Sequence, residues 1–311
     1  LMVFGLIAQI SPRLLRIWSP WIFCITLVFL LMVMARGEFG GGAQRWLDIG
    51  IVQFQPSEIM KISVPMMVAW FMHERPLPPT FKQLLILLLI FCAPTFLIYQ
   101  QPDLGTALLV MFSGGLTVLL AGLSLRLIAV LGVLSLSAIP VLWHYMFEYQ
   151  RARVLTFFNP ESDPLGAGYN IIQSKIALGS GGLFGKGWLN GTQAHLEFLP
   201  ERSTDFIFAV IGEEFGLLGL LLLLGLYLLL VGRGLYIASQ AQDTFSRLLA
   251  GGLSLTFFVY VFVNSGMVSG LLPIVGVPLP LVSAGGTSMV TLMAGFGILA
   301  AIHGNRKRLV S

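Results

Sequence analysis

Ionisable side chains stand inside or beside long apolar runs at three places in this 311-residue sequence. Glu58 and Lys61 lie three residues apart near the start of one run. Asp103 begins a second run, and Asp205 precedes a third. Because a charge within an apolar span is costly, such residues are candidates for function unless they only neutralise one another. These three places define the candidate site.

Glu58 and Lys61 belong to the stretch Gln55-Pro-Ser-Glu-Ile-Met-Lys61. Residues three apart share one face of a helix, so the two charges are expected to meet. Two interpretations follow. The pair makes insertion into a membrane tolerable, as such pairs normally do, or the Lys61 ammonium is aimed at a substrate phosphate.

Asp103 follows Pro102 in the stretch Gln100-Gln-Pro-Asp-Leu-Gly-Thr106. A proline and an aspartate at this point are typical of a helix start, with Asp103 as the N-cap. The functional interpretation places Asp103 in the same outer cavity as Lys61. The sequence leaves both interpretations open.

Asp205 joins a long polar loop to an apolar helix, and Glu213 and Glu214 follow about 12 Å further along that helix at 1.5 Å per residue. A carboxylate in the first turn of a helix is favoured by the helix dipole, which is the structural interpretation of Asp205. A carboxylate at a lipid–water boundary, under a lid, is also well placed to act as a general base. We therefore take Asp205 as the candidate catalytic residue.

The elements that must position these residues are membrane helices. The chain is 56% hydrophobic and 10% charged, far from the roughly 25% charged residues of a soluble domain. A helix needs about 20 apolar residues to cross a membrane. Nine such runs are predicted, at 1–10, 17–35, 57–73, 82–99, 104–123, 126–147, 205–232, 247–268 and 284–303. Because these runs lack the alternation of barrel strands, we expect an all-α polytopic bundle, a single domain over 1–311, with its first run cut short at the amino end.

Basic residues in short loops predict the orientation. If the tail from His303 is cytoplasmic, the other cytoplasmic basic residues are Arg13, Arg16, Arg75, Lys82, Arg126, Arg233 and Arg247. All carboxylates except Glu74 and Asp243 then fall on the outer side. We therefore expect a multi-pass protein of the bacterial inner membrane whose active site faces the periplasm.

The outer segment 148–204 is far longer than a helix connection requires, and loops of that length are usually functional or disordered. Its aromatic residues argue against disorder, and 171–178 is expected to form two amphipathic helical turns with Lys175 on the polar side. We interpret this large periplasmic loop as a lid. The glycines of 179–187 do not fit a phosphate-binding loop, because Ser180 and Gly187 stand at required Gly and Ser/Thr positions, and a flexible lid hinge is the better interpretation.

The segment 269–283 contains Pro273, Pro278 and Pro280 among apolar residues. Non-helical backbone at membrane depth is tolerated only when it is buried in protein or lines a cavity. The helix start that follows, at 285–288, is interpreted either as an anion site or as a tight turn with small residues for packing.

Other classes of site find little support. The two cysteines lie in apolar runs, and the four histidines lack the spacing of a zinc motif. A net charge of +4 is weak support for nucleic-acid binding, and no nucleic-acid partner is expected.

Several motifs together resemble the SEDS family (shape, elongation, division and sporulation) over nearly the whole chain. They are Gly42-Ala-Gln-Arg-Trp-Leu47, Gln55-Pro-Ser-Glu-Ile-Met-Lys61, Gln101-Pro-Asp-Leu-Gly105, Tyr169 with Gln173-Ser174, Leu199-Pro-Glu-Arg-Ser-Thr-Asp-Phe206 and Pro278-Leu-Pro-Leu-Val-Ser-Ala-Gly-Gly286. The stretch 159–169 is more similar to the elongation branch than to the division branch. Members of this family have ten spans, so the resemblance implies that the first span is missing here.

The resemblance implies a peptidoglycan glycosyltransferase that polymerises lipid II, an undecaprenyl diphosphate-linked disaccharide peptide, beside a class B penicillin-binding protein. It implies that Asp205 is catalytic and that Glu58, Lys61 and Asp103 belong to the same cavity. Asp205 would accept the proton of the acceptor hydroxyl. Lys61, with Arg153, Lys175 or Arg202 or a divalent cation such as Mg or Mn, would offset the charge of the leaving diphosphate.

Two alternatives remain. A flippase or transporter of the lipid-linked precursor would also carry intramembrane charges, but near the midplane and on both sides. A non-catalytic scaffold for a transpeptidase would not need Asp205. Polymerisation of purified lipid II separates these possibilities.

Overall fold

The computed structural model describes residues 1–36, 38–40, 43–48, 53–162, 168–195, 198–199 and 201–308. Gly42, Pro200 and residues 163–167, which belong to motifs named above, lie outside the described residues. The chain forms two compact units. The first comprises Leu1–Leu123, Leu229–Val259 and Gly286–Ser311, and the second comprises Ser124–Leu228 and Tyr260–Gly285.

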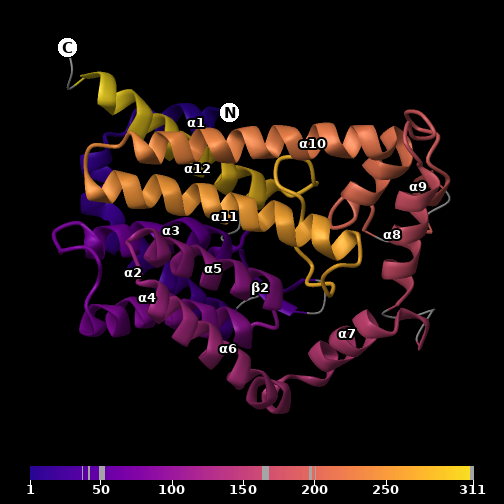
Figure 1. Ribbon diagram of the computed structural model, residues 1–311, viewed down its shortest axis with the longest axis horizontal. Helices are drawn as coiled ribbons and strands as arrows, with labels where there is room; N and C mark the ends of the chain where they lie inside the picture. Colours follow the sequence, from indigo (N-terminus) through magenta and orange to yellow (C-terminus); the bar gives the residue numbers. More distant parts are fainter. Residues whose placement is uncertain are drawn as a thin grey trace. The chain divides into compact units, whose positions relative to one another are not determined.

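The first unit is a bundle of helices (Figure 1). It contains α1 (Met2–Ile7), α2 (Pro12–Arg36), α3 (Pro56–Met72), α4 (Phe81–Gln100), α5 (Leu104–Leu120) and α12 (Gly286–Arg308). Helix α3 packs against α2, α4 and α5, while α1 packs against α12. Two longer helices, α10 (Ile207–Ser239) and α11 (Thr244–Val268), contribute residues to both units.

Helix α3 is the core of the first unit. Met60, Val64 and Val68 are fully buried, as are most other side chains of this helix. By contrast, α2 and α4 keep apolar side chains such as Trp21 and Leu89 exposed. A helix that is apolar all round and partly exposed is expected where lipid replaces water as the solvent.

Local polar contacts fix where these helices begin. The Thr80 backbone N–H donates to Gln83 Oε1 over 2.7 Å at the start of α4. Asp103 caps α5, and Pro56 occupies the first position of α3, where its missing N–H costs nothing. These signals explain why the predicted boundaries of α3, α4 and α5 lie close to the observed ones.

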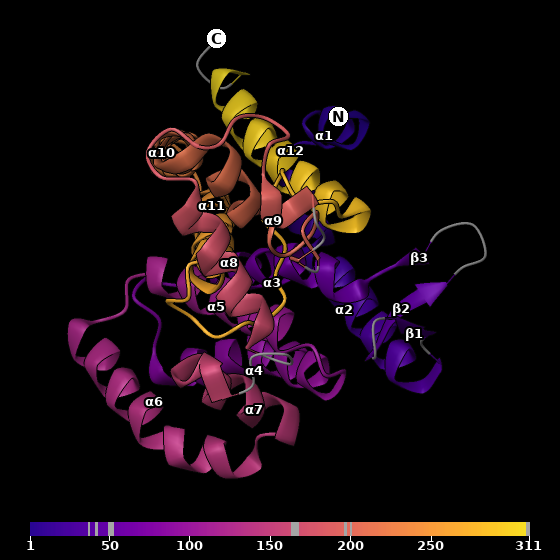
Figure 2. The same cartoon turned by 90° about the vertical axis from the view of Figure 1, so that its right-hand side faces the viewer.

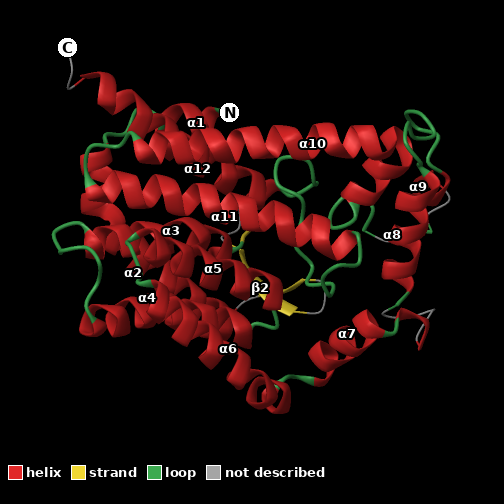
Figure 3. Ribbon diagram, viewed as in Figure 1, coloured by secondary structure: helices red, strands yellow, loops and turns green. Residues whose placement is uncertain are grey.

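A small antiparallel sheet lies between the predicted runs 17–35 and 57–73 (Figure 3). Its strands are β1 (Glu38–Gly40), β2 (Ala43–Asp48) and β3 (Gln53–Phe54), and the pairing places Leu47 opposite Phe54. The all-α prediction had no place for this sheet, because strands this short give almost no periodic signal. The fold is otherwise the predicted helical membrane bundle.

The second unit contains the predicted lid (Figure 2). It comprises α6 (Leu125–Tyr145), α7 (Glu148–Phe158), the 3₁₀ turn η1 (Pro160–Ser162), α8 (Tyr169–Ser180), α9 (Thr192–His195), the first part of α10 and the end of α11. Helix α8 covers 171–178, so the predicted amphipathic helix is confirmed. The segment 269–285, which follows α11, has no regular secondary structure.

A helix overlaps each of the nine predicted runs, but only five helices in the described part of the chain are long and apolar enough to cross a membrane on their own. They are Pro12–Ala35, Phe81–Gln100, Ile207–Ser239, Thr244–Val268 and Gly286–Asn305. Helices α3 and α5 have 17 residues each, and α1 has six. The polytopic character is confirmed, and the number of nine crossings stays a prediction.

Candidate active site

Asp205 lies in a turn, residues 201–206, that the segment 269–285 holds in place. Ser283 Oγ donates to the Thr204 carbonyl over 2.5 Å, and the Ala284 N–H donates to the Ser203 carbonyl over 2.8 Å. Ser283 Oγ itself accepts from the Leu279 N–H over 2.7 Å. The Ser283 side chain and the Ala284 backbone of this segment therefore satisfy the two carbonyls on the amino side of Asp205.

Asp205 is half-buried, and its main-chain carbonyl accepts a 2.9 Å hydrogen bond from Asn264 Nδ2. Its carboxylate lies against Gly276, where a Cβ atom would stand 3.5 Å from Asp205 Oδ2. Gly276 has a φ of +70°, a conformation that favours glycine. The backbone of Gly276 thus forms one wall beside the candidate base.

Helix α10 begins at Ile207, two residues after Asp205, and has no acidic residue in its first turn. The observed start lies two residues after the predicted one, and Asp205 stands outside the first turn. The next residue, Phe206, is buried, and its N–H donates to the Glu201 carbonyl. The buried Phe206 side chain and this hydrogen bond hold the turn. Because Asp205 belongs to this turn and α10 begins after it, the interpretation of Asp205 as a first-turn carboxylate does not apply.

Two basic residues predicted for the site contact the same segment. Arg153 Nη1, from α7, donates to the Ile274 carbonyl over 3.3 Å. Lys175, from α8, lies over Gly270 so closely that a Cβ there would overlap its Cε. Arg202 is half-buried and lies in the Asp205 turn itself. The segment 269–285 therefore brings Arg153, Lys175 and the Asp205 turn together within the second unit.

The other predicted residues form a group in the first unit. Lys61 Nζ lies 2.6 Å from Glu58 Oε1, and both side chains are buried. Asp103 Oδ1 accepts from the Thr106 N–H over 3.1 Å, which confirms its role as N-cap of α5. Asp103 Oδ2 accepts from Gln55 Nε2 over 3.0 Å, and this second contact joins the starts of α3 and α5. The predicted residues thus occur as two groups, one in each unit.

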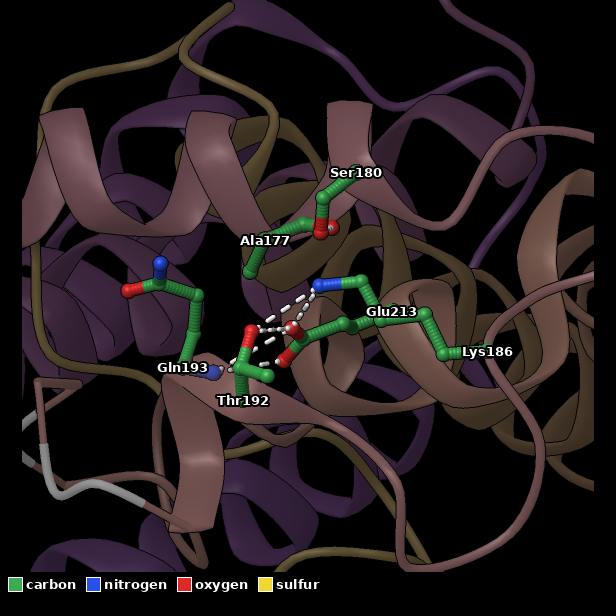
Figure 4. A network of polar contacts seen from close by, with 6 residues as sticks. All are labelled: Ala177, Ser180, Lys186, Thr192, Gln193 and Glu213. Atoms are coloured by element: carbon green, nitrogen blue, oxygen red, sulfur yellow. Dashed lines mark hydrogen bonds and ion pairs between the residues drawn. The ribbon is translucent and has the colours of Figure 1, made fainter.

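A further ion pair in the second unit was not predicted as a pair (Figure 4). Glu213 is fully buried, and Lys186 Nζ lies 2.6 Å from its Oε1. Thr192 Oγ1 donates to the same oxygen over 3.0 Å, and the Gln193 N–H donates over 3.2 Å. The sequence indicated only that Glu213 was unusual, because Lys186 lies far away along the chain.

The glycine loop is fastened to α10. The Lys186 and Gly187 N–H groups donate to the carbonyls of Glu213 and Glu214, next to a kink at Gly216 with a φ of +67°. A Cβ at Gly185 would stand 2.1 Å from the Glu214 carbonyl oxygen. These glycines let the backbone of the loop approach α10 closely. Hydrogen bonds hold the loop against the helix where a flexible hinge was expected.

Asn264, which contacts the Asp205 turn, was not among the residues predicted from the sequence. The available signal was an amide inside the apolar run of α11, since polar residues within such runs are rare and usually functional.

Among the residues that the structure describes, no three His, Cys, Asp or Glu side chains gather into a metal-binding group. Mg²⁺ is commonly held by one or two carboxylates together with water and substrate phosphates, so the divalent cation stays a prediction.

Comparison with known proteins agrees with this geometry. Residues 1–308 match the Cell cycle protein family of FtsW, RodA and SpoVE. The peptidoglycan glycosyltransferase MrdB of Escherichia coli K12 is 59% identical over 310 residues, which cover 99% of this chain and 84% of that protein. MrdB of Helicobacter pylori 26695 is 38% identical over 305 residues, 96% of this chain and 78% of that protein.

Two solved structures share the fold. A chain from a study of polymerization and crosslinking by a peptidoglycan synthase complex aligns with a TM-score of 0.84 at 33% identity, covering 98% of this chain and 86% of that chain. The rod shape determining protein RodA of Thermus thermophilus aligns with a TM-score of 0.72 at 29% identity, covering 98% of this chain and 84% of that chain. The family motifs, the helical membrane fold and these matches together establish that the chain belongs to the SEDS family of FtsW, RodA and SpoVE cell cycle proteins.

Proposed function

We propose that this chain polymerises lipid II into glycan strands on the periplasmic face of the bacterial inner membrane, with Asp205 as the general base. The relatives at 59% and 38% identity are named peptidoglycan glycosyltransferases, and this chain is an enzyme of that class. The observation that carries the assignment of the base is the Asp205 turn. It holds a half-buried carboxylate beside the bare backbone of Gly276.

The proposed reaction joins two sugars. The 4-hydroxyl oxygen of the acceptor sugar attacks the anomeric carbon of the donor, and the bond between that carbon and the diphosphate oxygen breaks. The hydroxyl proton passes to the Asp205 carboxylate, and the electron pair of the broken bond leaves with undecaprenyl diphosphate. A base in this position raises the nucleophilicity of the hydroxyl oxygen only as the new bond forms.

The leaving diphosphate needs positive charge near it, and electrostatic help of this kind is often the largest catalytic contribution. Arg153 and Lys175 are supported for this role because both contact the segment that frames Asp205. Arg202 is supported by its place in the same turn. Lys61 is proposed from the family resemblance, although its ammonium is already paired with Glu58. No step is assigned to a metal ion.

A crosslinking partner is the second part of the proposal. One of the similar structures comes from a peptidoglycan synthase complex in which polymerization and crosslinking are coordinated. We infer that this chain works beside a class B penicillin-binding protein, whose transpeptidase would crosslink the new strands. The lipid tails of the substrate would stay among the membrane lipids throughout.

The test is polymerisation of lipid II by the purified protein with its partner. Asp205→Asn keeps the size of the side chain, so the variant is expected to fold and to lose about 10²- to 10⁴-fold in rate. Asp243→Asn is the matched control. Asp243 Oδ2 accepts from the Ser246 N–H at another helix start, and an asparagine oxygen accepts equally well there. A near-normal rate for Asp205→Asn would move the base to Asp103 or Glu58, and translocation of lipid II without polymer would favour the transporter.

The orientation has its own test. Cys24 and Cys92 are first replaced by alanine. A single cysteine is then introduced either at Ser239, the exposed last residue of α10, or at Gly166, which lies outside the described residues. Membrane-impermeant reagents should label the two positions from opposite sides. Labelling of both from the periplasm would contradict the periplasmic placement of the site.

A further inference from the structure

Asn264 is a fully buried amide that joins three segments of the second unit. Its Nδ2 donates to the Asp205 carbonyl over 2.9 Å and to the Val277 carbonyl over 2.7 Å. Asn264 itself belongs to α11, Asp205 to the turn before α10, and Val277 to the segment 269–285. One side chain therefore ties the candidate base to two other parts of the chain.

The two donated hydrogen bonds fix the orientation of the amide. A side-chain amide carries two N–H donors, and both are used here. Rotation of the amide by 180° would put Oδ1 against two carbonyl oxygens, so the observed assignment is the only one that makes both bonds. Oδ1 finds no hydrogen-bond partner among the described residues. The amide therefore contacts the other two segments through its donors alone.

Each acceptor lies in one of the two segments that meet where Gly276 contacts the Asp205 carboxylate. One is the carbonyl of Asp205 itself. The other belongs to Val277, the residue after Gly276, whose backbone lies against Asp205 Oδ2. The separation between the carboxylate and this wall is therefore set at both ends by the same NH₂ group.

We propose that Asn264 is a positioning residue for Asp205, which holds the base and the Gly276 wall at a fixed separation. This proposal rests on the proposed function, in which Asp205 takes the proton of the acceptor. Because Asn264 is fully buried, it acts through the backbone of Asp205 and Val277 and does not touch the substrate. A base displaced by about 1 Å loses up to about 10²-fold in rate while substrate binding elsewhere is kept.

The experiment uses the full chain with its partner, and measures kcat, KM for lipid II and thermal unfolding in detergent. Asn264→Leu removes both donors at similar volume, and Asn264→Asp removes the amide N–H groups while keeping the shape. Ser265→Ala is the matched control, since Ser265 Oγ donates only within α11, to the Val261 and Phe262 carbonyls. We expect about 10- to 100-fold lower kcat for both Asn264 variants with KM within about threefold, and no change for the control.

A double variant separates this proposal from the assignment of the base. If Asn264 acts through Asp205, Asn264→Leu should cause no further loss in the Asp205→Asn background, measured with radiolabelled lipid II at the residual rate. A full second loss, an unchanged kcat in Asn264→Leu, or failure of both Asn264 variants to fold would overturn the positioning role. A near-normal rate of Asp205→Asn alone would instead overturn the proposed base.

Discussion

Glu58 and Asp205 show two ways in which this chain keeps a carboxylate close to a membrane. Glu58 is buried in the first unit and paired with Lys61 at 2.6 Å. Asp205 is half-buried in the second unit, and hydrogen bonds to the backbone of its turn keep it in place. The first arrangement neutralises the charge, whereas the second arrangement leaves the carboxylate partly accessible.

The comparison separates the cost of a charge from its use. Removal of one partner from a buried pair leaves the other charge uncompensated, so the protein loses much of its stability when such a pair is broken. A half-buried carboxylate beside a glycine wall has less to lose in stability and more to lose in chemistry. Substitutions at Glu58 should therefore lower stability more than activity, and substitutions at Asp205 should lower activity more than stability.

The largest loss of stability is expected for Glu58→Gln. Lys61 would stay buried and lose the Glu58 carboxylate from its ion pair, and the free energy of unfolding should fall by about 3 to 5 kcal/mol. Glu148→Gln is the matched control, because Glu148 pairs with Arg151 at the same spacing but its side chain is 93% exposed. The control should cost about 0 to 1 kcal/mol. Equal thermal stability of the two variants would contradict the contrast between buried and exposed pairs.

A smaller loss is expected for Lys186→Met. Glu213 would keep Thr192 and the Gln193 N–H but lose its cation, and a hydrogen bond to a charged group contributes about 1.5 to 3 kcal/mol. Loss of this pair should also expose the loop 181–195 to limited proteolysis. Lys82→Met, at an exposed lysine, serves as the control. Unchanged unfolding and unchanged proteolysis would show that this pair does not fasten the loop.

The double change Glu58→Gln with Lys61→Met should restore stability to within about 1 kcal/mol of the parent, since a buried pair replaced by neutral side chains is often tolerated. Thermal unfolding measures this recovery. The rate of lipid II polymerisation then decides the role of Lys61. A loss of activity in the stable double variant would support phosphate binding, and full activity would leave the pair a structural one.

The smallest effect on stability is expected for Asp103→Asn. The asparagine oxygen still accepts from the Thr106 N–H, so the N-cap of α5 is kept, and Gln55 can turn its amide oxygen toward the new NH₂ group. The cost should therefore stay below about 1 kcal/mol. Activity sharpens the comparison here as well. A polymerisation rate near that of the parent would make Asp103 a cap alone, whereas a large fall in rate at unchanged stability would show that its charge takes part in the chemistry.

Local signals in the sequence predicted most of the helices and several contacts within them. The apolar runs located the membrane helices, Pro102 and Asp103 predicted a helix start, and the amphipathic pattern predicted α8. The spacing of Glu58 and Lys61 predicted their contact. Each of these features depends on residues within one or two helical turns, where periodicity and capping govern the structure.

Contacts between distant segments could not be predicted in the same way. Lys186 and Glu213 are 27 residues apart, Ser283 and Thr204 are 79 apart, and Asn264 and Asp205 are 59 apart. Such pairs depend on how loops without regular structure are folded, and no period in the sequence reports this. Of these residues, only Glu213 and Asp205 stood out in the sequence, as carboxylates within or beside an apolar run, and nothing in the sequence named their partners.

The kink at Gly216 has a consequence for membrane thickness. From Leu217 to Ser239 the helix α10 is about 34 Å long at 1.5 Å per residue, already close to the thickness of a hydrocarbon core of about 30 Å. A Cβ at Gly216 would collide with the backbone of Leu183 and Gly185, so the bend is built into the contact with the loop. The length of α10 beyond the kink is thus matched to one thickness of the hydrocarbon core. Bilayers with longer acyl chains would shift Asp205 relative to the lipid headgroups, and with it, under the proposed function, the depth at which an isoprenoid-linked sugar chain meets the Asp205 carboxylate.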